Sequence, residues 1–269
     1  MLVNGEQRDT IAIMDRGFQY GDGLFETIEV RENTPIFLEQ HLQRLNRDSQ
    51  RLYLPKFDLN VSRAEISQLC ENAGDAVLKI IITRGTGGRG YRQPENIKPT
   101  RMLSLHPFPD YPQSYYTDGI VARICNTRLG LNPTLAGMKH LNRLEQILAR
   151  AEWQDNLIHE GIMLDFNGRV IEGTMTNLFY AKNSELFTSS LNLCGIAGIL
   201  RGWVFEKMRV MEHNFFVENL FEADEIFVCN SIMGICGVQQ IEQQHFSIGD
   251  ITKKLQFMLE IEKQKQVAL

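Results

Sequence analysis

The chain has 269 residues, of which 43% are hydrophobic, and carries a formal net charge of −5 at pH 7. This length suits one large domain or two domains of ordinary size, with enough apolar residues to fill real cores. The acidic balance, without a dense tract of Lys and Arg, argues against nucleic acid or an anionic membrane as a partner.

Targeting and metal-binding signals are missing from the sequence. The first residues do not combine a basic region with an apolar core, and no run approaches the roughly 20 apolar residues of a membrane span. We therefore expect a cytoplasmic protein. The five cysteines are widely scattered, with no CxxC pair and no histidine in ligand spacing. We expect them to be reduced and mostly buried, and we expect no metal site.

The first 106 residues predict a sheet with two helices packed on it. The predicted elements are a hairpin whose arms are residues 2–5 and 10–15, a strand at 24–33 that returns through 34–38, helices at 38–54 and 62–74, and strands at 76–84 and 101–108. Ser62 is the expected N-cap of the second helix, with Glu65 as its capping-box partner.

A proline-rich stretch follows this sheet. Pro107, Pro109 and Pro112 fall within eight residues, and prolines at that density resist both helix and central strand. We therefore place a linker at 107–118, between an N-terminal domain of residues 1–106 and a C-terminal domain of residues 119–269.

The second half also mixes strands and helices. It predicts a strand at 119–127, a helix from 139 to about 156, a meander over 160–189 with an Asn-Gly turn at 167 and 168, a helix at 203–214, a strand at 221–231 and a helix at 250–264. The simplest architecture is α+β, with two halves and a cleft between them.

Lys139 lies at the start of the helix predicted after residue 136. Leu141, Leu144, Leu148 and Ala151 recur at helical spacing and predict its buried face. A helix N-terminus disfavours the ammonium form of a lysine and leaves more of the free amine, which an imine-forming lysine needs. A solvated lysine at a helix start would give the same local pattern.

Three other features have two readings each. The sequence GTGGRG at 85–90 fits G-x-G-x-x-G, but a proline follows at position 94 where a dinucleotide site needs a helix, so we reject that site. The loop is either flexible only or exposes Arg89 to bind a carboxylate. Glu172 lies at the end of a predicted strand, where a glutamate is usually solvated. Arg44 can likewise be explained as a residue of the polar face of its helix.

Six blocks taken together resemble one enzyme family. They are, in order, DRGFQYGDGLFETI, HLQRL, TRGTGGRGY, AGMKHLNRLEQ, VIEGTMTNLF and GIAGILR. This set is similar to the fold-type IV pyridoxal-phosphate enzymes, which include branched-chain aminotransferases, D-amino-acid aminotransferases and 4-amino-4-deoxychorismate lyases. Within the family, RGTGGRGY together with KHLNRLEQ most resembles the lyases.

The resemblance implies a two-domain fold-type IV architecture, with a smaller N-terminal and a larger C-terminal domain, and pyridoxal 5'-phosphate as the cofactor. Lys139 matches the lysine that binds the cofactor covalently and serves as the catalytic base. Glu172 matches the carboxylate that pairs with the pyridinium nitrogen, and Arg44 matches the arginine that binds the phosphate.

Further roles follow from the same resemblance. The amides around Gly198 and Ile199, at a turn that opens a helix, and the hydroxyl of Ser231 are expected to bind the phosphate. Arg89 matches an arginine that binds a substrate carboxylate in the D-amino-acid enzymes. Thr27 is a candidate for the acid that protonates the departing enolpyruvyl group.

The resemblance favours elimination of pyruvate from aminodeoxychorismate, a small-molecule substrate, to give p-aminobenzoate for folate biosynthesis. Phe25 stands where the aminotransferases usually have a tyrosine, and Leu200 replaces a threonine that touches the phosphate in some relatives. A D-amino-acid or branched-chain transaminase remains an alternative, as does a non-catalytic binding module that keeps only the fold. The family also implies a homodimer.

Overall fold

The computed structural model describes residues 1–54, 58–93 and 95–268, and the chain divides into two compact units. Unit 1 comprises Met1–Pro109, Lys139–Asn142 and Lys263–Leu269, and unit 2 comprises Asp110–Met138 and Arg143–Glu262. The linker predicted at 107–118 spans the first passage between the units and contains the short helix α4 (Ser114–Thr117). The mixed α and β character and the two-part organisation agree with the sequence-based expectation.

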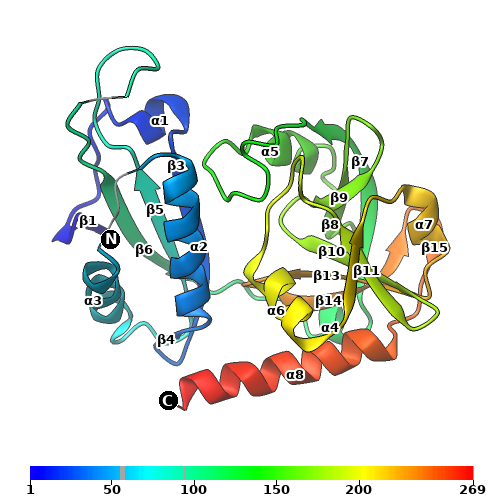
Figure 1. Cartoon of the computed structure of the whole chain (residues 1–269). Helices are drawn as coiled ribbons and strands as arrows, with labels where there is room; N and C mark the ends of the chain where they lie inside the picture. Colours follow the sequence, from blue (N-terminus) through cyan, green and yellow to red (C-terminus); the bar gives the residue numbers. More distant parts are fainter. Residues whose placement is uncertain (55–57, 94, 269) are drawn as a thin grey trace. The chain divides into compact units, whose positions relative to one another are not determined.

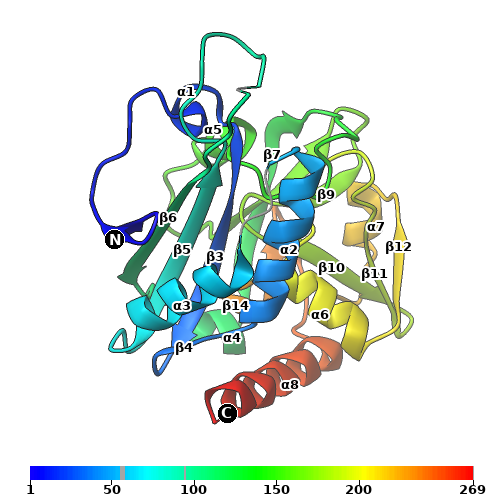
Figure 2. The same ribbon diagram turned by 60° about the vertical axis from the view of Figure 1, so that its left-hand side comes forward.

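A six-stranded antiparallel sheet with the order β2-β1-β6-β5-β3-β4 forms the centre of unit 1. Its strands are β1 (Leu2–Val3), β2 (Glu6–Gln7), β3 (Gly23–Arg31), β4 (Thr34–Pro35), β5 (Ala76–Thr83) and β6 (Thr100–Pro107). The helices of this unit are α1 (Arg16–Tyr20), α2 (Leu38–Arg51) and α3 (Leu59–Cys70). Figures 1 and 2 show α2 and α3 over the same face of the sheet.

The two faces of this sheet have different environments because successive strand residues point to opposite sides. On the face covered by the helices, Leu24 and Ile28 of β3 pack in one cluster with Leu42 and Leu45 of α2. Phe25 and Thr27 alternate with these residues and are half-buried on the opposite face. The predicted strand-turn-strand and the first long helix are therefore confirmed.

Two details of unit 1 differ from the prediction. The second arm of the N-terminal hairpin is β2, which pairs with β1 across the Asn4 and Gly5 turn, rather than residues 10–15. Helix α3 begins earlier than expected, because the carboxylate of Asp58 accepts hydrogen bonds from the amides of Asn60 and Val61 and is the N-cap in place of Ser62.

Unit 2 contains a nine-stranded mixed sheet with the order β12-β11-β10-β13-β14-β7-β8-β9, and β15 pairs with β14. Its strands are β7 (Ile120–Leu129), β8 (Glu160–Asp165), β9 (Val170–Gly173), β10 (Asn177–Lys182), β11 (Glu185–Ser189), β12 (Val210–His213), β13 (Glu225–Asn230), β14 (Gly234–Ile241) and β15 (Gln244–His245). Its helices after α4 are α5 (Leu144–Arg150), α6 (Ile199–Lys207), α7 (Val217–Phe221) and α8 (Asp250–Val267), whose last residues belong to unit 1.

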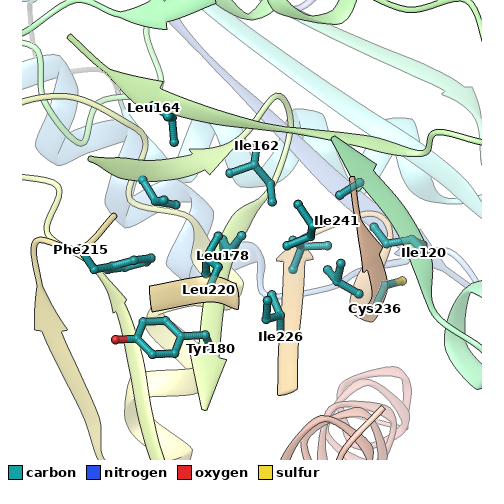
Figure 3. Packing of buried hydrophobic residues seen from close by; sticks show 14 of the residues in the cluster. Ile120, Ile162, Leu164, Leu178, Tyr180, Phe215, Leu220, Ile226, Cys236 and Ile241 are labelled. Carbon is teal, nitrogen blue, oxygen red and sulfur yellow. The ribbon is translucent and has the colours of Figure 1, made fainter. Parts of the chain in front are cut away.

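The core of unit 2 is built from aliphatic side chains of adjacent strands. Figure 3 shows Ile162, Leu178, Ile226 and Ile241 converging on one cluster, and each is fully buried. Burying a side chain of this size is worth roughly 1.5–3 kcal/mol. The hairpin predicted around Gly168 is confirmed as β8 and β9. The meander predicted over 160–189 is wrong beyond this hairpin, because β10 pairs with β11 and β13 and not with β9.

The helices of unit 2 differ from the prediction in two places. Helix α5 covers only Leu144–Arg150, and Leu144 and Leu148 are 72% and 60% exposed, so the predicted buried stripe is wrong. Its buried residues are Gln146 and Ala149. The helix predicted at 203–214 runs from 199 to 207, and the remainder forms β12, which pairs in parallel with β11.

Strand β14 was not predicted from the sequence, although it connects β13 and β7 in the sheet. The five cysteines are all free and buried, as expected. In the described part of the chain, no helix has the length and apolar character that crossing a membrane requires.

Candidate functional site

Lys139 lies in a short extended segment that pairs with β3 in unit 1. The amide of Phe25 donates a hydrogen bond to the Lys139 carbonyl at 3.0 Å, and the amide of Leu141 donates to the Gly23 carbonyl at 3.0 Å. The Nζ atom of Lys139 is 4.2 Å from the centroid of the Phe25 ring. The expected helix start at Lys139 is therefore wrong, since α5 begins only at Leu144, and the sheet edge rather than a helix terminus holds this lysine.

A second lysine contacts the same aromatic ring. Lys79 of β5 has its Nζ atom 5.8 Å from the Phe25 centroid, and Lys79 is the direct cross-strand partner of Thr27. The half-buried face of the sheet thus places two lysine Nζ atoms near one ring, and Thr27 lies on the same face of β3 as this ring. Sequence reasoning assigned no role to Lys79, although a single lysine inside the apolar run AVLKIIIT is a detectable signal.

On the opposite face, Glu26 of β3 forms a buried cluster with two residues of α2. Its Oε1 accepts a hydrogen bond from Arg44 Nε at 2.8 Å, and its Oε2 accepts one from His41 Nδ1 at 2.6 Å and another from Arg44 Nη2. Burial by itself raises the pKa of Glu26, but Arg44 and His41 outweigh burial and lower the pKa to about 2. The carboxylate is therefore ionised at neutral pH.

His41 completes this cluster without a charge of its own. Burial lowers the pKa of His41 below its ordinary value despite the adjacent Glu26. A neutral ring that donates from Nδ1 to a carboxylate presents Nε2 as an acceptor. The cluster escaped sequence reasoning, although Glu26 occupies a core-facing position in the alternation of β3, which is a usable signal.

Glu172 lies on β9 in unit 2 and is only 3% exposed. Its Oε2 accepts a hydrogen bond from the amide of Ile196 at 2.8 Å, and the side-chain amide of Asn177 lies 3.5 Å from the same atom. The alternative of a solvated glutamate is thereby excluded. A buried, oriented carboxylate is suited to hold a proton on a ligand nitrogen.

Asn177, the first residue of β10, connects Glu172 to the start of α6. Its Oδ1 accepts a hydrogen bond from the amide of Gly198 at 3.0 Å, and its Nδ2 donates to the Ile196 carbonyl at 2.8 Å. No role was predicted for Asn177 from the sequence.

Gly198 is the N-cap of α6, as expected for a turn that opens a helix, and Ile199 is the first helical residue. Gly198 has no side chain that could cap this terminus, and its own amide donates to Asn177 Oδ1. A Cβ atom at position 198 would lie 2.2 Å from Asn177 Oδ1, so only glycine fits. The first amides of a helix carry partial positive charge and suit a phosphate.

Ser231 follows β13 in a turn and is half-buried. The neighbouring Asn230 fixes this turn, because its Oδ1 accepts hydrogen bonds from the amides of Ile232 and Met233 at 2.9 and 2.7 Å. Its Nδ2 donates to the Met175 carbonyl at 3.2 Å.

Arg89 is exposed in the glycine-rich loop between β5 and β6. Arg16 fastens this loop at two points, since its amide donates to the Gly85 carbonyl and its Nη1 donates to the Gly90 carbonyl, both at 2.9 Å. No helix follows within residues 91–93 and 95–99, and the proline at position 94 lies outside the described residues. The loop therefore lacks the element that a dinucleotide fingerprint needs.

The structure brings the expected residues together in two groups. In unit 1, Lys139 and Thr27 belong to the surroundings of Phe25. In unit 2, Glu172 and the start of α6 share Asn177 as a common hydrogen-bond partner. Each group combines a lysine or a carboxylate with neighbouring residues that contact or orient it.

Known proteins are similar to this chain over nearly its whole length. The family model described as Amino-transferase class IV matches residues 23–241. An aminodeoxychorismate lyase of Vibrio harveyi is 35% identical over 264 residues, which cover 94% of this chain and 97% of that protein. A putative branched-chain-amino-acid aminotransferase of Methanocaldococcus jannaschii is 29% identical, over 95% of this chain and 93% of that protein.

A solved structure is also similar. The crystal structure of 4-amino-4-deoxychorismate lyase from Pseudomonas aeruginosa is 42% identical and superposes with a TM-score of 0.93, covering 97% of this chain and 98% of that chain.

Proposed function

The chain belongs to the class IV aminotransferase family, and we propose that it is a 4-amino-4-deoxychorismate lyase, which eliminates pyruvate from its substrate and gives p-aminobenzoate for folate biosynthesis. The observation that carries the proposal is the match to two lyases over almost the full length of each chain. A branched-chain or D-amino-acid transaminase is the second candidate, because a putative aminotransferase also matches nearly the whole chain.

The cofactor of this family is pyridoxal 5'-phosphate, and the residues of the chain fit it. Lys139 supplies an amine, Glu172 a buried carboxylate, and α6 a helix terminus at which only glycine fits beside Asn177. When bound, the cofactor supplies an electron sink for carbanion chemistry. We propose that Arg44, the first amides of α6 around Gly198 and Ile199, and the hydroxyl of Ser231 bind its phosphate. The amide of Gly198 also donates to Asn177 Oδ1.

Lys139 has two tasks in this proposal. Its Nζ atom binds the cofactor covalently, and as a free amine it takes the proton from the substrate carbon that carries the amino group. Glu172 holds a proton at the ring nitrogen of the cofactor, which strengthens the withdrawal of electrons. Departure of the enolpyruvyl oxygen leaves an aromatic ring in the product, so the elimination is strongly downhill.

The substrate carries two carboxylates, and the chain offers two cations for them. We propose that Arg89 binds one carboxylate through its planar fork and that Lys79, beside Phe25, binds the other as a point charge. Thr27 is the cross-strand partner of Lys79, so its hydroxyl is a candidate to protonate the leaving group.

Two coarser proposals concern assembly and location. Leu144, Ile147 and Leu148 expose an apolar face on α5, with exposed fractions of 60% or more, which supports a homodimer that covers this face. Five free, buried thiols are compatible with a reducing compartment and support the cytoplasm.

The deciding experiment incubates the purified protein with aminodeoxychorismate and no keto acid. A lyase releases p-aminobenzoate and pyruvate under these conditions, whereas a transaminase needs a keto-acid acceptor. We expect both products from the parent and from a Lys182→Ala control, which loses only an exposed ion pair with Glu222. We expect none from Lys139→Ala. If the parent gives neither product but transfers an amino group once a keto acid is supplied, the transaminase is favoured.

A further inference from the structure

Glu160, the first residue of β8, is a fully buried carboxylate for which the proposed function has no use. Its Oε1 accepts hydrogen bonds from the amide of Gly161 at 2.8 Å, and from the amide and hydroxyl of Thr174 at 3.0 and 2.6 Å. Its Oε2 accepts bonds from the hydroxyl of Thr176 at 2.8 Å and from the amide of Met175 at 3.4 Å. All five donors are neutral, so hydrogen bonds alone compensate the loss of hydration.

Four of these five bonds come from one turn. Residues 174–176 connect the end of β9 to the start of β10, so the turn lies between Glu172 and Asn177 in the chain. Gly173 precedes it, and a Cβ atom there would lie 2.2 Å from Thr176 Oγ1 and 2.7 Å from the Glu160 carboxyl carbon. The turn is therefore packed against Glu160 so closely that only glycine fits at position 173.

The same turn is connected to the second phosphate-binding element of the proposal. The carbonyl of Met175 accepts a hydrogen bond from the Asn230 side chain, and Asn230 fixes the turn that carries Ser231. The turn at 174–176 thus contacts Asn230 on one side and Glu160 on the other, and it is continuous in sequence with Glu172 and Asn177.

We propose that Glu160 is a positioning residue for the cofactor. By fixing the turn at 174–176, Glu160 determines the positions of Glu172, of Asn177 and of the turn that carries Ser231. One buried carboxylate then orients Glu172, which pairs with the ring nitrogen of the cofactor. It also orients Asn177 and the turn that carries Ser231, which belong to the proposed phosphate site. The inference rests on the proposed function, because it assigns Glu160 to the same cofactor.

The variant Glu160→Gln tests this inference because it keeps the shape of the side chain and replaces one acceptor oxygen by an amide NH2 group that faces donors. Glu225 provides a matched control. It is 6% exposed, lies in the same unit, and accepts hydrogen bonds from the amides of Ile251 and Thr252 and from the Thr252 hydroxyl, at the start of α8. Among the described residues, these hydrogen bonds of Glu225 do not involve a proposed cofactor residue, so Glu225→Gln loses comparable bonds elsewhere.

Three quantities are measured on each variant: the dissociation constant of pyridoxal phosphate by absorbance titration, the absorption maximum of the bound cofactor, and amide exchange of residues 173–178 in the cofactor-free protein. For Glu160→Gln we expect a dissociation constant at least about tenfold higher, because the amide NH2 group faces hydrogen-bond donors that are left buried without an acceptor. We also expect a shifted absorption maximum and faster exchange. For Glu225→Gln we expect a lower melting temperature, with the dissociation constant and spectrum of the parent.

A Glu160→Gln variant with the parent's dissociation constant and absorption maximum would overturn the inference, even if exchange in the turn were faster. If Glu160→Gln does not fold, Thr176→Val is measured instead, because it removes only the hydrogen bond from the Thr176 hydroxyl to Oε2. The inference then stands only if this variant also raises the dissociation constant of pyridoxal phosphate. A parent protein that binds no pyridoxal phosphate would instead refute the proposed function, so the two failures are distinguishable.

Discussion

Replacing Glu26 by glutamine should destabilise the protein strongly, although the side chain keeps its size. Glu26 is 1% exposed and is the carboxylate that pairs with the buried guanidinium of Arg44 and the ring of His41. Burial raises its pKa, but the two partners lower it from 4.5 to about 2. A fall of this size corresponds to about 3 kcal/mol of stabilisation. Removing one partner of a buried pair typically costs about 3–5 kcal/mol.

Urea unfolding of the cofactor-free protein at pH 7 measures this loss. The control is Glu39→Gln, which breaks an exposed pair with Arg63 and should cost less than about 1 kcal/mol. A loss below about 1 kcal/mol for Glu26→Gln would refute the reasoning, because it would mean that Arg44 does not depend on this carboxylate.

The same pair predicts a pH dependence with a definite sign. The pKa of Glu26 is lower in the folded chain than in the unfolded chain, so its stabilisation is fully present above pH 4.5 and is lost as the pH falls towards about 2. Comparing unfolding free energies of the parent and Glu26→Gln through this range isolates the contribution. The difference between the two proteins should shrink as the pH falls, and a constant difference would contradict the assignment.

Three further substitutions test the proposed cofactor and substrate contacts. Gly198→Ala places a Cβ atom 2.2 Å from Asn177 Oδ1, so absorbance titration should show weaker binding of pyridoxal phosphate, whereas unchanged affinity would argue against a phosphate at the start of α6. Glu172→Gln should retain the cofactor and lower kcat at least about tenfold in steady-state assays, because the ring nitrogen loses its anionic partner, and an unchanged rate would count against that role. Arg89→Ala should raise KM at least about tenfold with little change in cofactor affinity. A lower cofactor affinity with an unchanged KM would mean that Arg89 binds the cofactor rather than the substrate.

Much of the fold follows from short-range pattern in the sequence. The alternation in β3 predicts a strand with one buried face, and the leucine spacing in α2 predicts its helix, because both patterns reflect the geometry of a single element. The order of six motifs along the chain was sufficient to identify the family, and that order places Lys139 and Glu172 without any knowledge of distances.

Helix α5 shows where pattern reasoning stops. The recurrence of Leu144 and Leu148 correctly indicates one side of a helix, but periodicity does not say what covers that side, and both residues are exposed in the chain. Likewise, the sequence predicts a helix through Val210 and Met211, and only their pairing with β11 makes them a strand.

The contacts around the candidate site were decided by tertiary structure. Glu26 meets Arg44 because a strand and a helix pack face to face, and Lys139 meets Phe25 because a distant segment pairs with the edge of β3. Glu160 accepts hydrogen bonds from the turn after Glu172 because β8 and β9 are adjacent in the sheet. The sequence by itself therefore determined which residues have the required chemistry, whereas the tertiary structure decided which of them are buried, ionised and oriented, since those properties depend on neighbours that are far apart in the chain.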